Sequence, residues 1–210
     1  MKIGICGAQG VGKTTLARQY AEENGIPLLE TKVGDYLSHL GIEIGKEYDP
    51  LKRMQVQLAI LDYLDRCYSM VDSFITDRTP LDVVAYSQEM MFNQTDPDVI
   101  AVFEEIQKRA VTLCLQFGLI VQIRPGIELK PEDYERRQRA ALDRVSVNRI
   151  DTLISGGIVD LIQTHKGKVT VKTMPKSRLT LRERIDILKD TVDDLERRLI
   201  ASASASALTH

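Results

Sequence analysis

Nine residues near the start of the chain, GAQGVGKTT at positions 7–15, are of the types that bind phosphate. Gly7, Gly12, Lys13 and Thr14 fit the spacing G-x-x-x-x-G-K-[ST] of a phosphate-binding loop. Glycines let backbone N–H groups turn inward, and the N-terminus of a following helix attracts negative charge. In this pattern Lys13 reaches the β- and γ-phosphates, and the Thr14 hydroxyl is a ligand of Mg²⁺. The residues expected to hold the nucleotide are Gly7, Gly10, Val11, Gly12, Lys13, Thr14 and Thr15.

The residues on either side of this loop favour a real site over a chance match. An apolar run, KIGIC at 2–6, precedes the loop, and a helical pattern, TTLARQYAEEN, follows it. A strand that leads through a glycine-rich bend into a helix is the context that such a loop requires. The sequence therefore predicts that the protein binds a nucleoside triphosphate.

A second pair of polar residues, Asp77 and Arg78, follows the third predicted strand. Ligands of an open α/β sheet bind beyond the carboxyl ends of its strands, so this pair lies beside the phosphate loop if the third strand neighbours the first. A carboxylate there can hold Mg²⁺ through water or accept a proton from an attacking hydroxyl, and a guanidinium can bridge phosphate oxygens. The alternative is a surface ion pair or a helix cap. Asp82, further along, is interpreted as a first-turn helix charge.

Four residues are candidates for binding the phosphate acceptor. Glu30 ends the second predicted strand, so it faces the same crevice and could bind the acceptor or act as a base; it could also be a solvated strand-end charge. Asp35 follows on the next segment and could line an acceptor pocket. Arg53 and Gln57 lie in a predicted helix, where a glutamine amide can pair with a base edge but is also often exposed without a function.

An arginine-rich segment follows the fourth predicted strand. Arginines on a helical hairpin can close over a γ-phosphate and exclude water, although a row of arginines is also common on a solvated helix face. Because a phosphate loop is present, we interpret residues 130–150 as a lid. Arg137 and Arg144 are the expected catalytic arginines, since their spacing puts them on one face of a continuous helix. The segment as a whole contains Arg136, Arg137, Arg139, Arg144 and Arg149.

These residues need a scaffold in which short strands alternate with helices. Alternation of this kind predicts βαβ units around a parallel sheet. The expected strands are 2–6, 26–30, 73–77, 119–123 and 169–173. The expected helices are 13–24, 50–70, 80–92, 97–117, 132–143 and 147–156. Together they form one domain that spans residues 1–175.

The C-terminal part of the chain has a different pattern. Thr180 and Glu183 have the spacing of a capping box at a helix N-terminus. Apolar residues then recur at steps of four and three, which predicts an amphipathic helix within residues 176–200 that either packs on its own domain or pairs with its copy in a homo-oligomer. The low-complexity stretch at 201–210 is expected to be disordered. The apolar residues are Leu181, Ile185, Leu188, Val192, Leu195 and Leu199.

Composition excludes several classes of protein. The 210 residues carry a formal net charge of −2, so no general basic field indicates nucleic-acid binding. Cys6, Cys67 and Cys114 lack metal-ligand spacing and are expected to be reduced, buried thiols. No signal peptide precedes the first strand and no apolar run has transmembrane length, so we expect a soluble cytoplasmic protein without a membrane partner.

Taken together, the chain resembles the small P-loop kinases of nucleosides and nucleotides, in particular the subgroup of ribosylnicotinamide-kinase-like and phage-encoded proteins. The resemblance covers about residues 1–175. It is carried by GAQGVGKTT, by TDRTPLDVVAYS at 76–87, and by ERRQRAALDR at 135–144 after LIVQIRPG.

This resemblance implies a P-loop NTPase fold with three α/β/α layers, a five-stranded parallel sheet and a helical lid. It also implies ATP with Mg²⁺ as the phosphate donor, Gly12, Lys13 and Thr14 as donor and metal contacts, Asp77 as the catalytic carboxylate and a metal contact, and Arg78 as a phosphate contact. Deoxynucleoside kinases have a Glu-x-x pattern with an aromatic residue at the second strand. This chain has Glu30-Thr31-Lys32, which leaves the acceptor open.

Three functions are consistent with these features. The first is transfer of the γ-phosphate of ATP to a nucleoside or nucleoside monophosphate. The second keeps this chemistry but acts on a hydroxymethylated base within DNA, with Lys166, Lys168, Lys172, Lys176 and Arg178 as the only dense positive run. The third is an oligomeric P-loop NTPase assembled through the C-terminal helix. The third strand lacks the acidic pair that this function favours.

Overall fold

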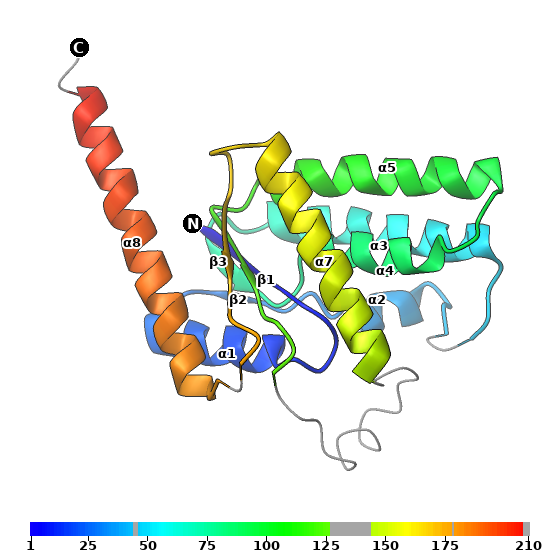
Figure 1. The fold of residues 1–210 in the computed structure, drawn as a ribbon, viewed down its shortest axis with the longest axis horizontal. Coiled ribbons are helices and arrows are strands. Elements are labelled where there is room, and N and C mark those ends of the chain that lie inside the picture. The colour runs from blue at the N-terminus through cyan, green and yellow to red at the C-terminus, as the bar shows by residue number, and fades with distance from the viewer. Residues whose placement is uncertain (44–45, 127–143, 178, 208–210) are drawn as a thin grey trace.

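A parallel sheet forms the centre of the computed structural model, which describes residues 1–43, 46–126, 144–177 and 179–207 (Figure 1). The sheet has five strands in the order β2-β3-β1-β4-β5, and every neighbouring pair is parallel. The five-stranded parallel sheet expected from the sequence is confirmed. The strands are β1 (Lys2–Cys6), β2 (Leu28–Leu29), β3 (Phe74–Thr76), β4 (Leu119–Gln122) and β5 (Thr170–Thr173).

The first strand is the central one. Gly4 of β1 is in register with Thr76 of β3 on one side and with Ile120 of β4 on the other. Because the strands are parallel, the segments that follow β1 and β3 leave the sheet at the same edge, side by side. The prediction that the third strand neighbours the first is therefore confirmed.

Helices cover both faces of this sheet. In Figure 1 the strands lie between α1 and α8 on one side and α3, α4, α5 and α7 on the other, which gives three layers. The helix bounds are α1 (Lys13–Asn24), α2 (Val33–His39), α3 (Pro50–Ser69), α4 (Pro80–Met90), α5 (Pro97–Cys114), α7 (Arg144–Thr164) and α8 (Leu181–Ala207).

Three of these helices begin at a proline that follows a capping residue. Proline is favoured in the first turn, where its missing N–H is not needed and its φ angle is already helical. At α3 the side chain of Asp49 accepts from Lys52 N, and at α5 the side chain of Asp96 accepts from Asp98 N. At α4 the cap is Thr79. These local signals place the starts of all three helices at the predicted residues.

The core consists of aliphatic strands and an aromatic cluster. Strands β1, β3 and β4 are buried almost throughout, as expected for a sheet covered on both faces. Phe117 packs edge-on against Tyr68, with ring centroids 5.1 Å apart, and against Phe74 at 6.1 Å. The three cysteines, Cys6, Cys67 and Cys114, are free and buried, as predicted.

Helix α7 is longer than the sequence suggests. We expected a helix at 147–156, ending at the Gly156-Gly157 pair, but α7 runs through both glycines to Thr164. Each glycine costs roughly 1 kcal/mol in a helix interior. Burial of Ile154, Ile158 and Leu161 against the domain outweighs that cost.

The segment after β2 was also misjudged. Residues Val33–His39 form a short helix, α2, which is absent from the helices expected from the sequence. It begins after Lys32, whose φ of 43° lies in the left-handed region. A single non-glycine residue in this conformation is not readable from residue types, which is why the helix was missed.

The C-terminal helix packs on its own domain. Its capping box is present: Thr180 Oγ1 donates to Glu183 Oε2 at 2.7 Å, and the Glu183 N–H donates back to Thr180 Oγ1 at 3.2 Å. Ile185, Leu188 and Val192 are buried in the single chain, on the side where α8 contacts α1. Of the two expectations for this helix, packing within the domain agrees with the structure.

The second half of α8 extends past α1, away from the sheet (Figure 1). There Leu199 is 55% exposed. The helix continues to Ala207, so the disordered tail predicted from residue 201 is wrong for residues 201–207. Residues 208–210 lie outside the described part of the chain. Among the described helices, none is both long enough and apolar enough to cross a membrane.

The packing of α8 can be tested with two leucines of the same helix. Leu188→Ala removes a fully buried side chain, so we expect it to lower the free energy of unfolding by about 2–5 kcal/mol. Leu199→Ala, in the exposed half, should change it by less than about 0.5 kcal/mol. Urea unfolding of both variants measures the difference. Equal effects would mean that α8 is not held by this face.

Candidate active site

The glycine-rich bend after β1 has the backbone that the motif requires. Gly10 and Gly12 have φ angles of 84° and 91°, in the region that side chains other than glycine rarely adopt. Gly12 is the N-cap of α1, and its carbonyl accepts the first helical hydrogen bond from Leu16 N at 3.0 Å. Because Gly12 has no side chain to cap the helix, the first-turn N–H groups of α1 remain available to an anion.

Lys13 is folded back onto this bend. Its Nζ donates to Gly7 O at 2.6 Å and to Ala8 O at 3.0 Å, and it lies 4.0 Å from Asp82 Oδ1. Burial lowers the pKa of Lys13, while the Asp82 charge opposes that shift. The bend therefore contains a desolvated positive charge, which is what a bound polyphosphate would meet.

Thr14, in the first turn of α1, and Asp77, directly after β3, come together beyond the carboxyl ends of β1 and β3. The Thr14 hydroxyl donates a short hydrogen bond to Asp77 Oδ2. A hydroxyl and a carboxylate are both oxygen ligands of the type that Mg²⁺ prefers. No group of three or more acidic, histidine or cysteine side chains in the described residues could hold a metal without help. Mg²⁺ would therefore need water and nucleotide phosphates as further ligands.

Arg78 lies on the same side, partly buried. Its positive charge contributes to the lowered pKa of Lys13, so the two cations face one region. Its backbone carbonyl accepts from the buried Tyr68 hydroxyl at 2.7 Å. This bond ties α3 to the turn between β3 and α4 and fixes the backbone at Arg78.

Asp82 has a larger role than the sequence suggests. Its Oδ2 accepts from Thr79 N at 2.8 Å and from Thr79 Oγ1 at 3.0 Å, which forms a capping box at α4. Its Oδ1 accepts from Gly7 N at 3.1 Å and faces Lys13. One buried carboxylate thus anchors the start of the bend to α4. The Thr-x-x-Asp spacing signals the cap, but no residue pattern reveals the contact with Gly7.

Glu30 is held by an arginine that the sequence reading did not select. Arg18 of α1 donates to Glu30 Oε1 at 2.8 Å. This hydrogen bond lowers the pKa of Glu30 and is the main cause of the raised pKa of Arg18, to which the Asp77 charge adds. Arg18 therefore stabilises the charged form of Glu30, one of the two carboxylates that were candidates for the base.

The other acceptor candidates lie on α2 and α3. Asp35 and Arg53 are exposed and Gln57 is partly buried, and none of them forms a hydrogen bond with Lys13, Thr14 or Asp77 in the described structure. These helices are joined by Tyr36 and Tyr63, whose rings stack with centroids 4.2 Å apart. The roles of Asp35, Arg53 and Gln57 remain predictions.

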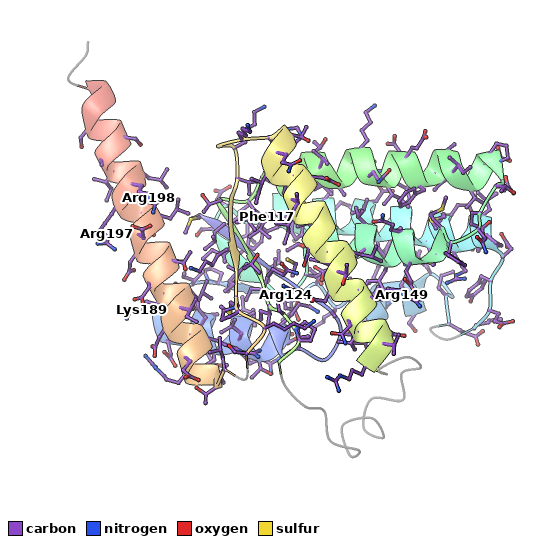
Figure 2. The ribbon with its side chains drawn as sticks, in the orientation of Figure 1. Phe117, Arg124, Arg149, Lys189, Arg197 and Arg198 are labelled. Carbon is purple, nitrogen blue, oxygen red and sulfur yellow. The ribbon has the colours of Figure 1, made fainter. Side chains whose placement is uncertain are left out.

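The predicted lid falls mainly on residues that the structure does not describe. Arg137 lies in the range 127–143, outside the described residues, as do Arg136 and Arg139. Arg144 is exposed at the start of α7, and Arg149, labelled in Figure 2, forms a short ion pair with Glu89 of α4. Arg149 is thus engaged in holding α7 against α4.

A buried carboxylate organises the two segments that follow β4 and β5. The Asp151 side chain is fully buried, and its Oδ2 accepts from Arg124 Nη2 at 2.8 Å, between the strands and α7 (Figure 2). Lys176 Nζ lies 3.7 Å from the same oxygen. Gln122 Nε2 lies 3.3 Å from Asp151 Oδ1. Lys176, part of the positive run considered for DNA, is therefore directed toward Asp151. The sequence reading missed both Arg124 and Asp151.

A family model described as an AAA domain matches residues 2–151, well over half of the chain. The chain belongs to this AAA domain family. A comparison with curated proteins finds none that matches. For this AAA domain protein, the family match includes β1 to β4 and the phosphate loop and ends before β5 and α8.

Solved structures share the fold of the AAA domain protein. Deoxyadenosine kinase from M. mycoides with bound dCTP has a TM-score of 0.64 at 14% identity, over 92% of this chain and 100% of that one. A NadR protein in complex with NAD and AMP-PNP has a TM-score of 0.57 at 16% identity, over 90% of this chain and 48% of that one. The expected P-loop NTPase fold and the resemblance to small P-loop kinases are confirmed at the level of fold.

The anchoring role of Asp82 gives a testable stability difference. Both carboxylate oxygens of Asp82 accept hydrogen bonds, whereas asparagine has one acceptor oxygen and one NH2 group. Asp82→Asn therefore leaves a buried N–H or O–H donor of Gly7 or Thr79 without an acceptor. We expect a loss of about 1–3 kcal/mol in the free energy of unfolding. Asp98→Asn, an exposed acid in the first turn of α5, should change it by under about 0.5 kcal/mol. Chemical denaturation measures both, and an Asp82→Asn value no larger than the control contradicts the anchoring role.

Proposed function

We propose that the protein is an ATP-dependent phosphotransferase that moves the γ-phosphate to a nucleoside or nucleoside monophosphate. The observation that carries this proposal is the contact between Thr14, on the phosphate loop, and Asp77, at the tip of β3. This contact puts the loop that is expected to hold the nucleotide directly next to a carboxylate suited to phosphoryl transfer.

In the proposed reaction the backbone of Gly7–Thr15 and the N-terminus of α1 hold the β- and γ-phosphates. Lys13 turns from the carbonyls of Gly7 and Ala8 to the phosphate oxygens, where its charge offsets the charge of the transition state. Mg²⁺, held by Thr14 and by Asp77 directly or through water, would neutralise charge on the phosphates.

Asp77 is the proposed base as well as a metal contact. Glu30 is the other candidate, but its hydrogen bond from Arg18 lowers its pKa, which makes Glu30 a weaker proton acceptor. Arg78 lies close enough to influence the charge of Lys13, so we assign it a phosphate contact. Arg144 at the start of α7 and Arg137 are proposed lid arginines that complete the site in the closed state.

The class of acceptor is supported by the fold neighbours. One holds dCTP and is a deoxyadenosine kinase, and another NadR structure is a complex with NR. Acceptor contacts are assigned to the α2–α3 side, where Asp35, Arg53 and Gln57 lie next to the Tyr36–Tyr63 stack.

Substitution of Asp77 separates transfer from nucleotide binding. Asp77→Asn keeps the shape of the side chain but removes its charge, so we expect transfer to fall by at least about a hundredfold, as for loss of a general base, while the Kd for ATP stays within a few fold. Lys13→Ala should weaken both. Asp72→Asn, exposed before β3, is the control and should match the wild type. Single-turnover transfer and equilibrium ATP binding measure the two effects. If Asp77→Asn transfers phosphate at close to the wild-type rate, Asp77 has no catalytic role.

An acceptor panel tests the function itself. Radiolabelled ATP with Mg²⁺ is incubated with nucleosides, nucleoside monophosphates, hydroxymethyl-containing DNA or no acceptor. We expect label on one nucleoside or monophosphate, and its loss when EDTA removes Mg²⁺. Label on the DNA alone, or release of free phosphate without an acceptor, contradicts the proposal.

A further inference from the structure

The C-terminal helix places a charged side chain on the phosphate loop. Arg184, in the first turn of α8, donates from Nη1 to the carbonyl oxygen of Val11 at 2.7 Å. Val11 lies within the GAQGVGKTT bend, whereas Arg184 lies beyond residue 151, where the family match ends. Only 3% of the Arg184 residue surface is exposed.

This arginine is buried without an anionic partner. Within the described residues no carboxylate forms an ion pair with Arg184, and its Nε atom has no hydrogen-bond partner. Burial lowers the pKa of the guanidinium, and no charge among the described residues offsets that shift. Burying a guanidinium without an anionic partner lowers the stability of the folded chain. We therefore expect this side chain to have a functional role that offsets the loss of stability.

The geometry of the peptide bond shows what the contact controls. In a trans peptide the C=O and N–H groups point in opposite directions, and the described chain has no cis peptide. When Arg184 holds the Val11 carbonyl, it also fixes the orientation of the Gly12 N–H, which belongs to the same peptide unit. Gly12 is the N-cap of α1 and one of the glycines expected to cradle phosphate.

Two buried side chains therefore hold the bend from its two ends. Asp82 of α4 accepts from Gly7 N at 3.1 Å, and Arg184 of α8 donates to Val11 O at 2.7 Å. Arg184 reaches this place because Ile185 and Leu188, its neighbours on α8, are buried against the domain. Docking of α8 and the shape of the loop are thus connected through one side chain.

We propose that Arg184 is a positioning residue for triphosphate binding and that α8 is part of the nucleotide site. The guanidinium fixes the Val11–Gly12 peptide with its N–H ready for a phosphate oxygen, and the bound triphosphate supplies negative charge near the buried cation. This inference rests on the proposed use of ATP, but it concerns binding and does not depend on which acceptor receives the phosphate.

The test compares three variants of α8 in the full-length chain. Arg184→Met keeps the bulk of the side chain without its donors, and Arg184→Lys restores the charge and one donor group. Arg182→Met is the matched control, because Arg182 is exposed and pairs only at the surface with Glu23 at 3.1 Å and Asp186 at 2.8 Å. For each variant the Kd for ATP, the KM for ATP, kcat, the acceptor KM and the thermal midpoint are measured.

We expect Arg184→Met to raise the Kd and KM for ATP roughly tenfold, the loss expected for a hydrogen bond from a charged donor. The acceptor KM should stay unchanged, and kcat at saturating ATP should stay within about threefold. Arg184→Lys should recover part of the affinity, and Arg182→Met should bind ATP like the wild type. Added ATP should raise the thermal midpoint of Arg184→Met less than that of the wild type.

A purely structural role gives a different result. If Arg184→Met lowers the thermal midpoint but binds ATP as tightly as Arg182→Met does, the inference is wrong. A wild-type chain that binds ATP but phosphorylates no acceptor would contradict the proposed function alone, since the binding comparison can still be made. A wild-type chain that does not bind ATP would overturn both.

Discussion

The parallel pairing of β1 with β3 is the contact on which the whole site depends. It puts the residue after β3 next to the bend after β1, so that a hydroxyl from one segment meets a carboxylate from the other. Thr14 and Asp77 are 63 positions apart in the sequence, and the pairing of β1 with β3 brings the segments that carry them to the same edge of the sheet. Neighbouring helices keep this edge in place: α4 begins at Pro80, three residues after Asp77, and the Tyr68 hydroxyl of α3 donates to the carbonyl of Arg78.

Three charged side chains with low exposure hold the bend after β1 through hydrogen bonds to its backbone. Lys13 is desolvated on the loop carbonyls, Asp82 holds Gly7 and Arg184 holds Val11. Such groups interact more strongly than they would in water. The same low exposure makes each of them expensive to leave unpaired, which couples the stability of the domain to the shape of the loop.

Sequence reasoning worked where the signal was local. The strand and helix on either side of the glycine-rich bend, the starts of α3, α4 and α5 and the Thr180–Glu183 cap each depend on a few neighbouring residues, and each was predicted correctly. It failed where distant residues meet. Asp82 was interpreted as a first-turn charge because its bond to Gly7 spans 75 positions, and Asp151 was missed because its partners lie in and directly after β4 and after β5. The length of α7 was underestimated because packing, which a sequence does not display, outweighs two glycines.

Helix α8 also limits how far the chain can be truncated from its C-terminal side without exposing the core. Tyr20 of α1 is almost fully buried, and α8 packs on α1 and covers it. Burial together with the nearby charges of Asp193 and Glu196, both on α8, raises the pKa of the Tyr20 hydroxyl to about 12. A shortened version that stops at residue 151, where the family match ends, would cut α7 and lose β5 and α8, so it would uncover this aromatic ring and leave the bend without Arg184. The smallest folded version of this domain therefore has to include the part of α8 that covers α1, although the family match ends at residue 151.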